Sequence, residues 1–581
     1  PTWRLDGVDP TGRRFFATPR FARDKPPLRI DVYVPPAEEF LASTSAQAVI
    51  RPWEAIYRRR GRGVEEFDVG RWLLRVLERW GGELDMDMDM DMDMEGSGEE
   101  GIQGRSRRGG RREEVALVAR YGVEKGMVGV ERLVKMWDGE GVCWKGVEVM
   151  EWERLRFGRQ VHEVISLVTV DGDEEGGGGD EALAGGRGVA MVFKSVLQEQ
   201  RYMYNELKML LSLEPHPNVI SRPIGVVTKK GRFGGRRGVC GFLLEWFPLG
   251  SLRERLLRDD YDATTSMAQR LRWARQVTEA FVHINRHEQA GFYPDLKPDN
   301  IVLREDRDTG LLDAVLIDLE QRGGWFAWSP PEVAYVEYLE MLADGSGLPD
   351  GELKEEIKGQ LRAYYEEPDW SPETGSQRYS NATGGFSSPW LALLRQRQAG
   401  GEGKDLLERA QVFMLGKLLW CILEGQAMVR CGIDHETLQD VDPEYESRRS
   451  GKVRAFPDFR RTPVELRELI RACTAGAPEW NTQEPRLPGV ILRGGKLYPA
   501  DWPVGLVATS GDTRAAAKRF WAQEVERARM FMGELLAFRG MLQEPSQLAA
   551  SASRPGLLKQ VHTRPLFSAI LNELTRIKGC V

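Results

Sequence analysis

The sequence lacks several features that would assign it to a common class. No apolar run approaches the length needed to cross a bilayer, so no membrane-spanning segment is expected. The six cysteines are scattered without a C-x-x-C pair, a pattern that predicts neither a zinc site nor a disulfide framework. The 81 basic and 88 acidic residues nearly balance, so a dedicated nucleic-acid binder is not expected either. Together with the absence of a secretory signal, the cysteine usage predicts an intracellular protein of the cytoplasm or nucleus.

The chain has 581 residues, which is too long for one ordinary domain and predicts two or three folded units. Residues 1–85 form a small predicted α+β module of unknown role: "LRIDVYV" alternates like a strand, and "VGRWLLRVLERW" has an apolar helical stripe. Residues 86–114 alternate Asp with Met and then turn arginine-rich. This stretch is too poor in apolar residues to form a core and predicts a disordered linker.

The remainder divides into a strand-rich part and a helix-rich part. Residues 115–247 read as strands, interrupted by a glycine-rich insert at 171–188. Helical periodicity dominates 248–545, with an insert at about 333–405, and 546–581 is expected to be a C-terminal tail. The pattern predicts an α+β fold with two lobes.

The stretch "GFYPDLKPDNIVL" at 291–303 contains the most informative motif. Asp295 is followed by Lys297 and Asn300, and "AVLIDLE" ends a short apolar strand at Asp318. Phosphoryl transfer needs a carboxylate facing the acceptor hydroxyl, oxygen ligands for Mg²⁺ and a cation near the transferred phosphate. These residues at this spacing predict that chemistry, with Asp295 and Lys297 catalytic and Asn300 and Asp318 as metal ligands.

On these motifs the chain resembles the protein kinase superfamily over roughly residues 150 to 540, in a divergent form similar to kinase-like proteins of filamentous fungi. The resemblance implies that Lys194 of "VAMVFKS" anchors ATP and that Glu206 of "NELKMLL" pairs with Lys194. In "GFLLEWF" it makes Leu244 the gatekeeper and runs the adenine-contacting hinge from Glu245 to Phe247. The implied cofactors are ATP and Mg²⁺, and the implied partner is a protein.

The departures from the family pattern are also specific. Only Gly158 remains of the glycine-rich loop that would contact ATP phosphates, and Tyr293-Pro294 replaces the His-Arg pair before Asp295. Glu320 stands where the Asp-Phe-Gly motif has glycine, and Gln411 replaces the aspartate that braces the catalytic loop. Because 319–328 contains no Ser, Thr or Tyr, control by phosphorylation of that segment is not expected. Pro331-Glu332 resembles the Ala-Pro-Glu ending of an activation segment.

Three functions are compatible with this sequence. The first is an ATP- and Mg²⁺-dependent protein kinase acting on Ser or Thr. The second is a kinase-fold enzyme that phosphorylates a small molecule, since "LIDLE" is similar to the strand end of aminoglycoside and choline kinases. The third is a pseudokinase scaffold, favoured by the poor glycine loop and by Glu320.

Overall fold

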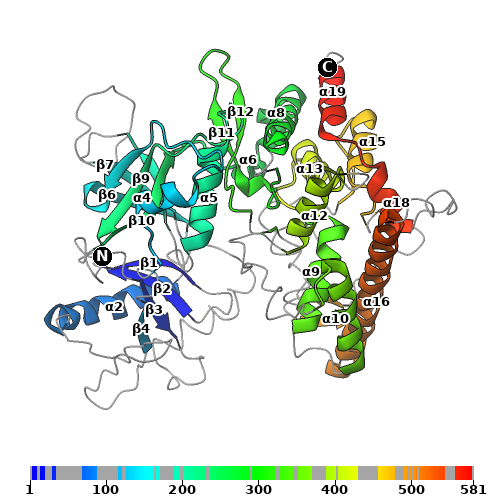
Figure 1. Cartoon of the computed structure of the whole chain (residues 1–581), viewed down its shortest axis with the longest axis horizontal. Coiled ribbons are helices and arrows are strands. Elements are labelled where there is room, and N and C mark those ends of the chain that lie inside the picture. Colours follow the sequence, from blue (N-terminus) through cyan, green and yellow to red (C-terminus); the bar gives the residue numbers. More distant parts are fainter. Residues whose placement is uncertain are drawn as a thin grey trace. The chain divides into compact units, whose positions relative to one another are not determined.

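The computed structural model describes most of the chain and divides it into two compact units (Figure 1). The first unit comprises 1–212 and 221–246, and the second comprises 213–220 and 247–581. The described residues are 3–8, 14–19, 29–34, 68–87, 116–120, 126–162, 165–170, 189–195, 200–230, 236–287, 291–321, 323–324, 328–344, 351–368, 388–400, 404–429, 456–477, 480, 490–493, 496–499, 503, 506, 509–543 and 556–578.

An antiparallel sheet lies at the start of the first unit. Its strands run in chain order: β1 (Trp3–Val8), β2 (Arg14–Pro19), β3 (Arg29–Tyr33) and β4 (Ala116–Arg120). Helix α2 (Asp68–Asp87) contacts β1 and buries Val69, Trp72, Leu73 and Leu77, as its apolar stripe predicted. Because β4 pairs with β3, the sheet of the N-terminal module does not end at residue 85. Residues 88–114 of the expected linker lie outside the described residues.

A second, six-stranded sheet forms the rest of the first unit. Its strands are β5 (Glu148–Glu151), β6 (Leu155–His162), β7 (Ile165–Val170), β8 (Met191–Ser195), β9 (Gly225–Lys230) and β10 (Arg237–Glu245), in the spatial order β5-β9-β10-β8-β7-β6. All neighbours are antiparallel except β5 and β9. The short helix α4 (Val130–Met136) precedes this sheet in the chain, η3 (Trp152–Arg154) joins β5 to β6, and helix α5 (Gln200–Ser212) contacts β10. The glycine-rich insert at 171–188 lies outside the described residues.

The second unit is largely helical. Its first half contains α6 (Leu252–Leu256), α7 (Tyr261–Thr264), α8 (Met267–Arg286), η4 (Pro298–Asn300) and the hairpin of β11 (Ile301–Glu305) and β12 (Leu312–Leu316). There follow α9 (Pro331–Asp344), α10 (Gly351–Tyr365), α12 (Ser388–Ala399), α13 (Leu406–Glu424), α15 (Val464–Cys473), the hairpin of β13 (Val490–Arg493) and β14 (Lys496–Pro499), α16 (Ser510–Gln543), α18 (Gly556–Thr563) and α19 (Phe567–Lys578). The predicted α+β fold is thus confirmed as a six-stranded mixed, curled sheet followed by a largely helical region.

Helix α13 lies at the centre of the second unit. Almost all of its side chains are buried, in agreement with a sequence that is apolar on every face. It contacts α8, α12, α15 and α18. A helix buried on all sides supplies a fixed platform for the loops that contact it.

Two helices form within 546–581, the segment that the sequence predicted as a C-terminal tail. Residues 556–578 form α18 and α19, which contact α13 and α8 respectively. The stripe Phe567, Ile570, Leu574 and Ile577 is buried, at spacings that place these four side chains on one helical face. This part of the supposed tail therefore belongs to the core of the second unit. In the expected insert, α9 and α10 share a buried core with α16.

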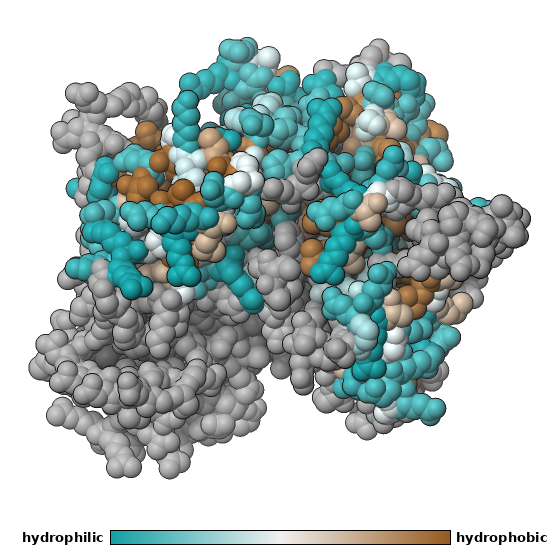
Figure 2. All heavy atoms as spheres, in the orientation of Figure 1, coloured by the Kyte–Doolittle hydropathy of each residue, from teal (hydrophilic) through white to brown (hydrophobic). Residues whose placement is uncertain are grey.

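The described surface is mixed in character. In the view of Figure 2, hydrophilic residues dominate and apolar ones form small groups between them. Among the described residues, no helix has both the length and the apolar composition that a bilayer crossing requires.

Candidate functional site

The loop 291–300 connects α8 to β11 within the second unit. Helix α8 ends where His287 leaves the helical conformation, and the one-turn helix η4 begins with Pro298 at its first position. Gln411 of the buried helix α13 braces the loop: its Oε1 accepts the Tyr293 backbone N–H at 2.8 Å. The side chain that replaces the expected aspartate therefore still holds this loop, as an uncharged acceptor.

Three of the predicted residues meet on this loop. The Lys297 Nζ lies 2.5 Å from Oδ2 of Asp295, and the Asn300 Nδ2 donates to the same oxygen at 3.0 Å. Asn300 also donates to the Asp295 carbonyl at 2.9 Å. Both partners of the Asp295 carboxylate are therefore the side chains that the sequence motif singled out, and only about a fifth of the Asp295 side chain is exposed.

The electrostatics of this group follow from its burial. Burial raises the pKa of Asp295, while the Lys297 charge and the hydrogen bonds from Lys297 and Asn300 oppose that rise, and the nearby Asp318 adds to it. Burial by itself would lower the pKa of Lys297, but the charge and hydrogen bond of Asp295 together with the charges of Asp318 and Asp299 outweigh burial, and the pKa of Lys297 is raised. Lys297 is thus held in its charged form beside the carboxylate.

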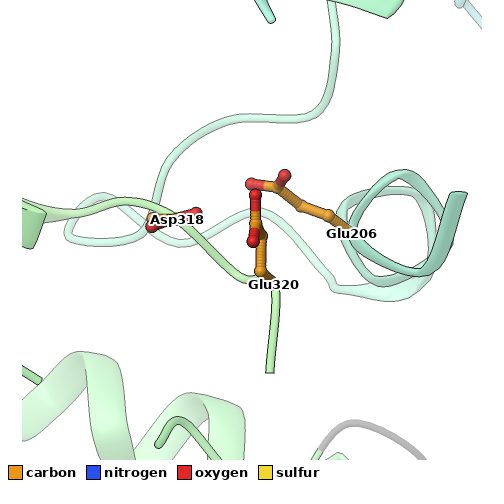
Figure 3. A group of neighbouring side chains, drawn as sticks. All are labelled: Glu206, Asp318 and Glu320. Atoms are coloured by element: carbon orange, nitrogen blue, oxygen red, sulfur yellow. The ribbon is translucent and has the colours of Figure 1, made fainter. Parts of the chain in front are cut away.

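Asp318 lies directly after β12, two residues beyond its last strand position. Its backbone is in the left-handed region, with a φ of 65°. The N–H of the preceding Ile317 donates to the Asn300 carbonyl at 3.0 Å, which ties the Asp318 segment to the loop of Asp295. In Figure 3, Asp318 and Glu320 project from this same stretch of chain. The second unit therefore brings Asp295, Lys297, Asn300 and Asp318 into one neighbourhood.

The predicted lysine–glutamate pair forms within the first unit. Lys194 lies on β8 opposite Phe242 of β10, and Glu206 projects from α5 (Figure 3). The Lys194 Nζ is 2.6 Å from Oε2 of Glu206, and both side chains are almost completely buried, with 8% and 2% exposed. Forming a buried ion pair of this kind costs desolvation free energy. Removing one of its partners strongly destabilises the folded protein.

The remaining predicted residues fall into three places. Gly158 lies within β6, where the pairing with β7 is irregular between Phe157 and Gln160. Leu244 is buried on β10, and Glu245 ends that strand. Phe247 is buried and is the first residue of the second unit after the chain leaves the first.

Gln321 was not predicted as part of this site. It donates from Nε2 to the Phe292 carbonyl at 2.9 Å. Gln321 belongs to no motif of its own, so periodicity and spacing contain no signal for it. Tyr293, noted in the sequence only as a departure, donates from its hydroxyl to the Ile317 carbonyl at 2.6 Å.

The oxygen atoms at this site suit a hard divalent cation. Asn300 uses its Nδ2 to donate to Asp295, which leaves its amide oxygen as the atom that can bind a cation. Together with the Asp318 carboxylate, this is the class of ligand that Mg²⁺ prefers. The residues present therefore fit the ion that the sequence implies.

Comparison with known proteins adds no assignment, since neither a family model nor a curated protein sequence matches this chain.

Proposed function

We propose that this chain is an ATP- and Mg²⁺-dependent protein kinase, in which residues 115–247 and 248–545 are the lobes of a kinase-like fold. It would transfer the γ-phosphoryl group to a Ser or Thr hydroxyl of a protein without control by phosphorylation of residues 319–328. The observation that carries the proposal is the convergence of Lys297 and Asn300 on the carboxylate of Asp295. The buried Lys194–Glu206 pair supports it from the other unit.

Each side chain has a defined task in this reaction. Asp295 orients the acceptor hydroxyl and accepts its proton as the oxygen bonds to phosphorus and the bond to the ADP oxygen breaks. Lys297 stabilises the negative charge on the transferred group, because it is held charged next to Asp295. Asn300 and Asp318 would hold Mg²⁺, which neutralises phosphate charge when bound. Lys194, oriented by Glu206, would anchor the nucleotide phosphates.

A scaffold without catalysis is the second candidate. The specific observation in its favour is that β6 and β7 contain Gly158 as their only glycine. A strand whose other residues all carry a Cβ approaches phosphates less closely than a glycine-rich loop does. Weak nucleotide binding would follow, although the charged groups of the second unit are complete.

A radiolabelled ATP assay tests the proposal. The full-length wild type is compared with Asp295→Asn, Asp318→Ala and the control Asp308→Asn, an exposed carboxylate in the β11–β12 turn. We expect label in protein for the wild type and the control, and a loss of about 100-fold or more for the two site variants. Equal labelling by all four proteins would contradict the proposal.

Two other outcomes identify the alternatives. The absence of a thermal shift with Mg²⁺ and millimolar ATP would favour the scaffold, since ligand binding stabilises the folded state by mass action. ATP turnover that requires an added small hydroxyl compound, with no label in protein, would favour a small-molecule phosphotransferase.

A further inference from the structure

The segment that carries Asp318 is fastened to the loop that carries Asp295 at more than one point within the second unit. Ile317 is held through both of its backbone polar groups. Its N–H donates to the Asn300 carbonyl at 3.0 Å, and its carbonyl accepts the Tyr293 hydroxyl at 2.6 Å. The residue that immediately precedes Asp318 is therefore fixed from both sides by the loop.

A second set of contacts with the loop follows Asp318 in the chain. Gln321 is 2% exposed, and its Nε2 donates to the Phe292 carbonyl at 2.9 Å. Further on, Gly324 packs so closely on the loop that a Cβ at this position would overlap the Pro294 carbonyl oxygen. Contacts on residues 292–294 thus flank the Asp318 segment before and after the carboxylate.

The backbone between the contacts of Ile317 and those of Gln321 is in an uncommon conformation. Asp318 and Gln321 have φ values of 65° and 58°, a region that residues with a Cβ rarely adopt. Such conformations persist where surrounding contacts specify them. The hydrogen bonds of Tyr293 and Gln321 are among the contacts that surround this segment.

We propose that Tyr293 and Gln321 are positioning residues that hold Asp318 in a single conformation, so that this segment does not switch between states. The catalytic consequence rests on the proposed function. Because Asp318 would be preorganised for Mg²⁺, phosphoryl transfer needs no activating rearrangement of 317–324. Tyr293 contributes to this by the hydrogen bond from its hydroxyl to the Ile317 carbonyl.

Hydrogen exchange on the full-length chain, without any ligand, tests whether Tyr293 holds the Asp318 segment in place. Tyr293→Phe removes one buried hydroxyl, and Tyr261→Phe is its matched control, since the Tyr261 hydroxyl of α7 donates to the Ile422 carbonyl at 2.8 Å. We expect the amides of 317–321 to exchange about tenfold faster in Tyr293→Phe than in Tyr261→Phe, the factor that one buried hydrogen bond contributes. Gly324→Ala, which displaces the segment from Pro294, should have the same effect. Equal exchange in Tyr293→Phe and Tyr261→Phe would overturn the proposal.

Activity separates a positioning role from a structural one. In Tyr293→Phe the Mg²⁺ concentration for half-maximal labelling should rise several-fold, whereas Tyr261→Phe should leave it unchanged at a similar loss of thermal stability. Faster exchange with unaltered Mg²⁺ dependence would overturn the positioning role of Tyr293. If the wild type transfers no phosphate, the proposed function fails. The hydrogen-exchange comparison alone then decides whether Tyr293 holds the Asp318 segment.

Discussion

Arg564 and Glu332, which are 232 positions apart in the sequence, form a bidentate ion pair with distances of 2.5 and 3.2 Å. Arg564 has no exposed surface and also donates to the carbonyls of Ala475 and Arg409. The pair joins the start of α9 to the segment between α18 and α19. It shows why the C-terminal helices belong to the core of the second unit.

Removing one partner of this pair should destabilise the second unit strongly. Arg564→Met leaves Glu332 buried without its bidentate partner, and we expect a loss of about 3–5 kcal/mol in unfolding free energy. Urea denaturation followed by tryptophan fluorescence measures this loss. The control is Arg576→Met on α19, where the pair with Glu573 is exposed and the expected change is below about 1 kcal/mol. Similar losses in both variants would show that the buried pair has no special role.

The Lys194–Glu206 pair gives a parallel prediction in the first unit. Lys194→Met should lower the unfolding free energy by about 3–5 kcal/mol, because Glu206 is left buried without its ion-pair partner. It should also abolish the thermal shift produced by ATP and Mg²⁺. Lys208→Met on the same helix as Glu206 is the matched control, since its pair with Glu140 is partly exposed and contributes about 0–1 kcal/mol. An undiminished ATP shift in Lys194→Met would exclude Lys194 as the nucleotide anchor.

Glu340 should make stability fall as the pH rises. Burial raises its pKa from 4.5 to about 8, and the Tyr365 hydroxyl donates to it at 2.6 Å. The folded state therefore binds a proton that the unfolded state has released, and stability is lost between the unfolded and the folded pKa. Glu340→Gln keeps an acceptor for Tyr365 and removes the titration. We expect it to stabilise the protein by on the order of 3 kcal/mol near pH 7, with no gain below about pH 4. Thermal denaturation across this range is the measurement, and a variant that follows the wild type at every pH would disprove the prediction.

Glu424 should make the stability of the folded state fall as the pH falls, the opposite of Glu340. Burial by itself raises its pKa, but hydrogen bonds from the Thr462 hydroxyl and from the backbone N–H groups of 460–462 outweigh it, and the pKa is lowered. The stabilisation is present above the unfolded pKa and is lost as the pH falls through the folded one. Glu424→Gln should therefore cost about 1–3 kcal/mol at neutral pH, and the deficit should shrink in acid. A deficit that stays constant from neutral to acidic pH would contradict this assignment.

Much of the architecture was predictable from local pattern. The apolar stripe on α2 predicts a half-buried helix, and this is observed. The spacing of Asp295, Lys297 and Asn300 likewise predicted a cluster, because these residues lie within one short loop. Local pattern could not show that β4 pairs with β3 or that α19 contacts α8, since these partners lie far away in the chain.

The sequence by itself determined the order of strands and helices, because helix and strand periodicity is a property of neighbouring residues. It also determined which polar groups the loop 291–300 and the end of β12 present. Only the tertiary structure decided that Gln411 braces Tyr293, that Gln321 holds Phe292 and that Arg564 meets Glu332. Each of these contacts satisfies a buried polar group with a partner from a remote segment, and no local pattern encodes which segment will supply it.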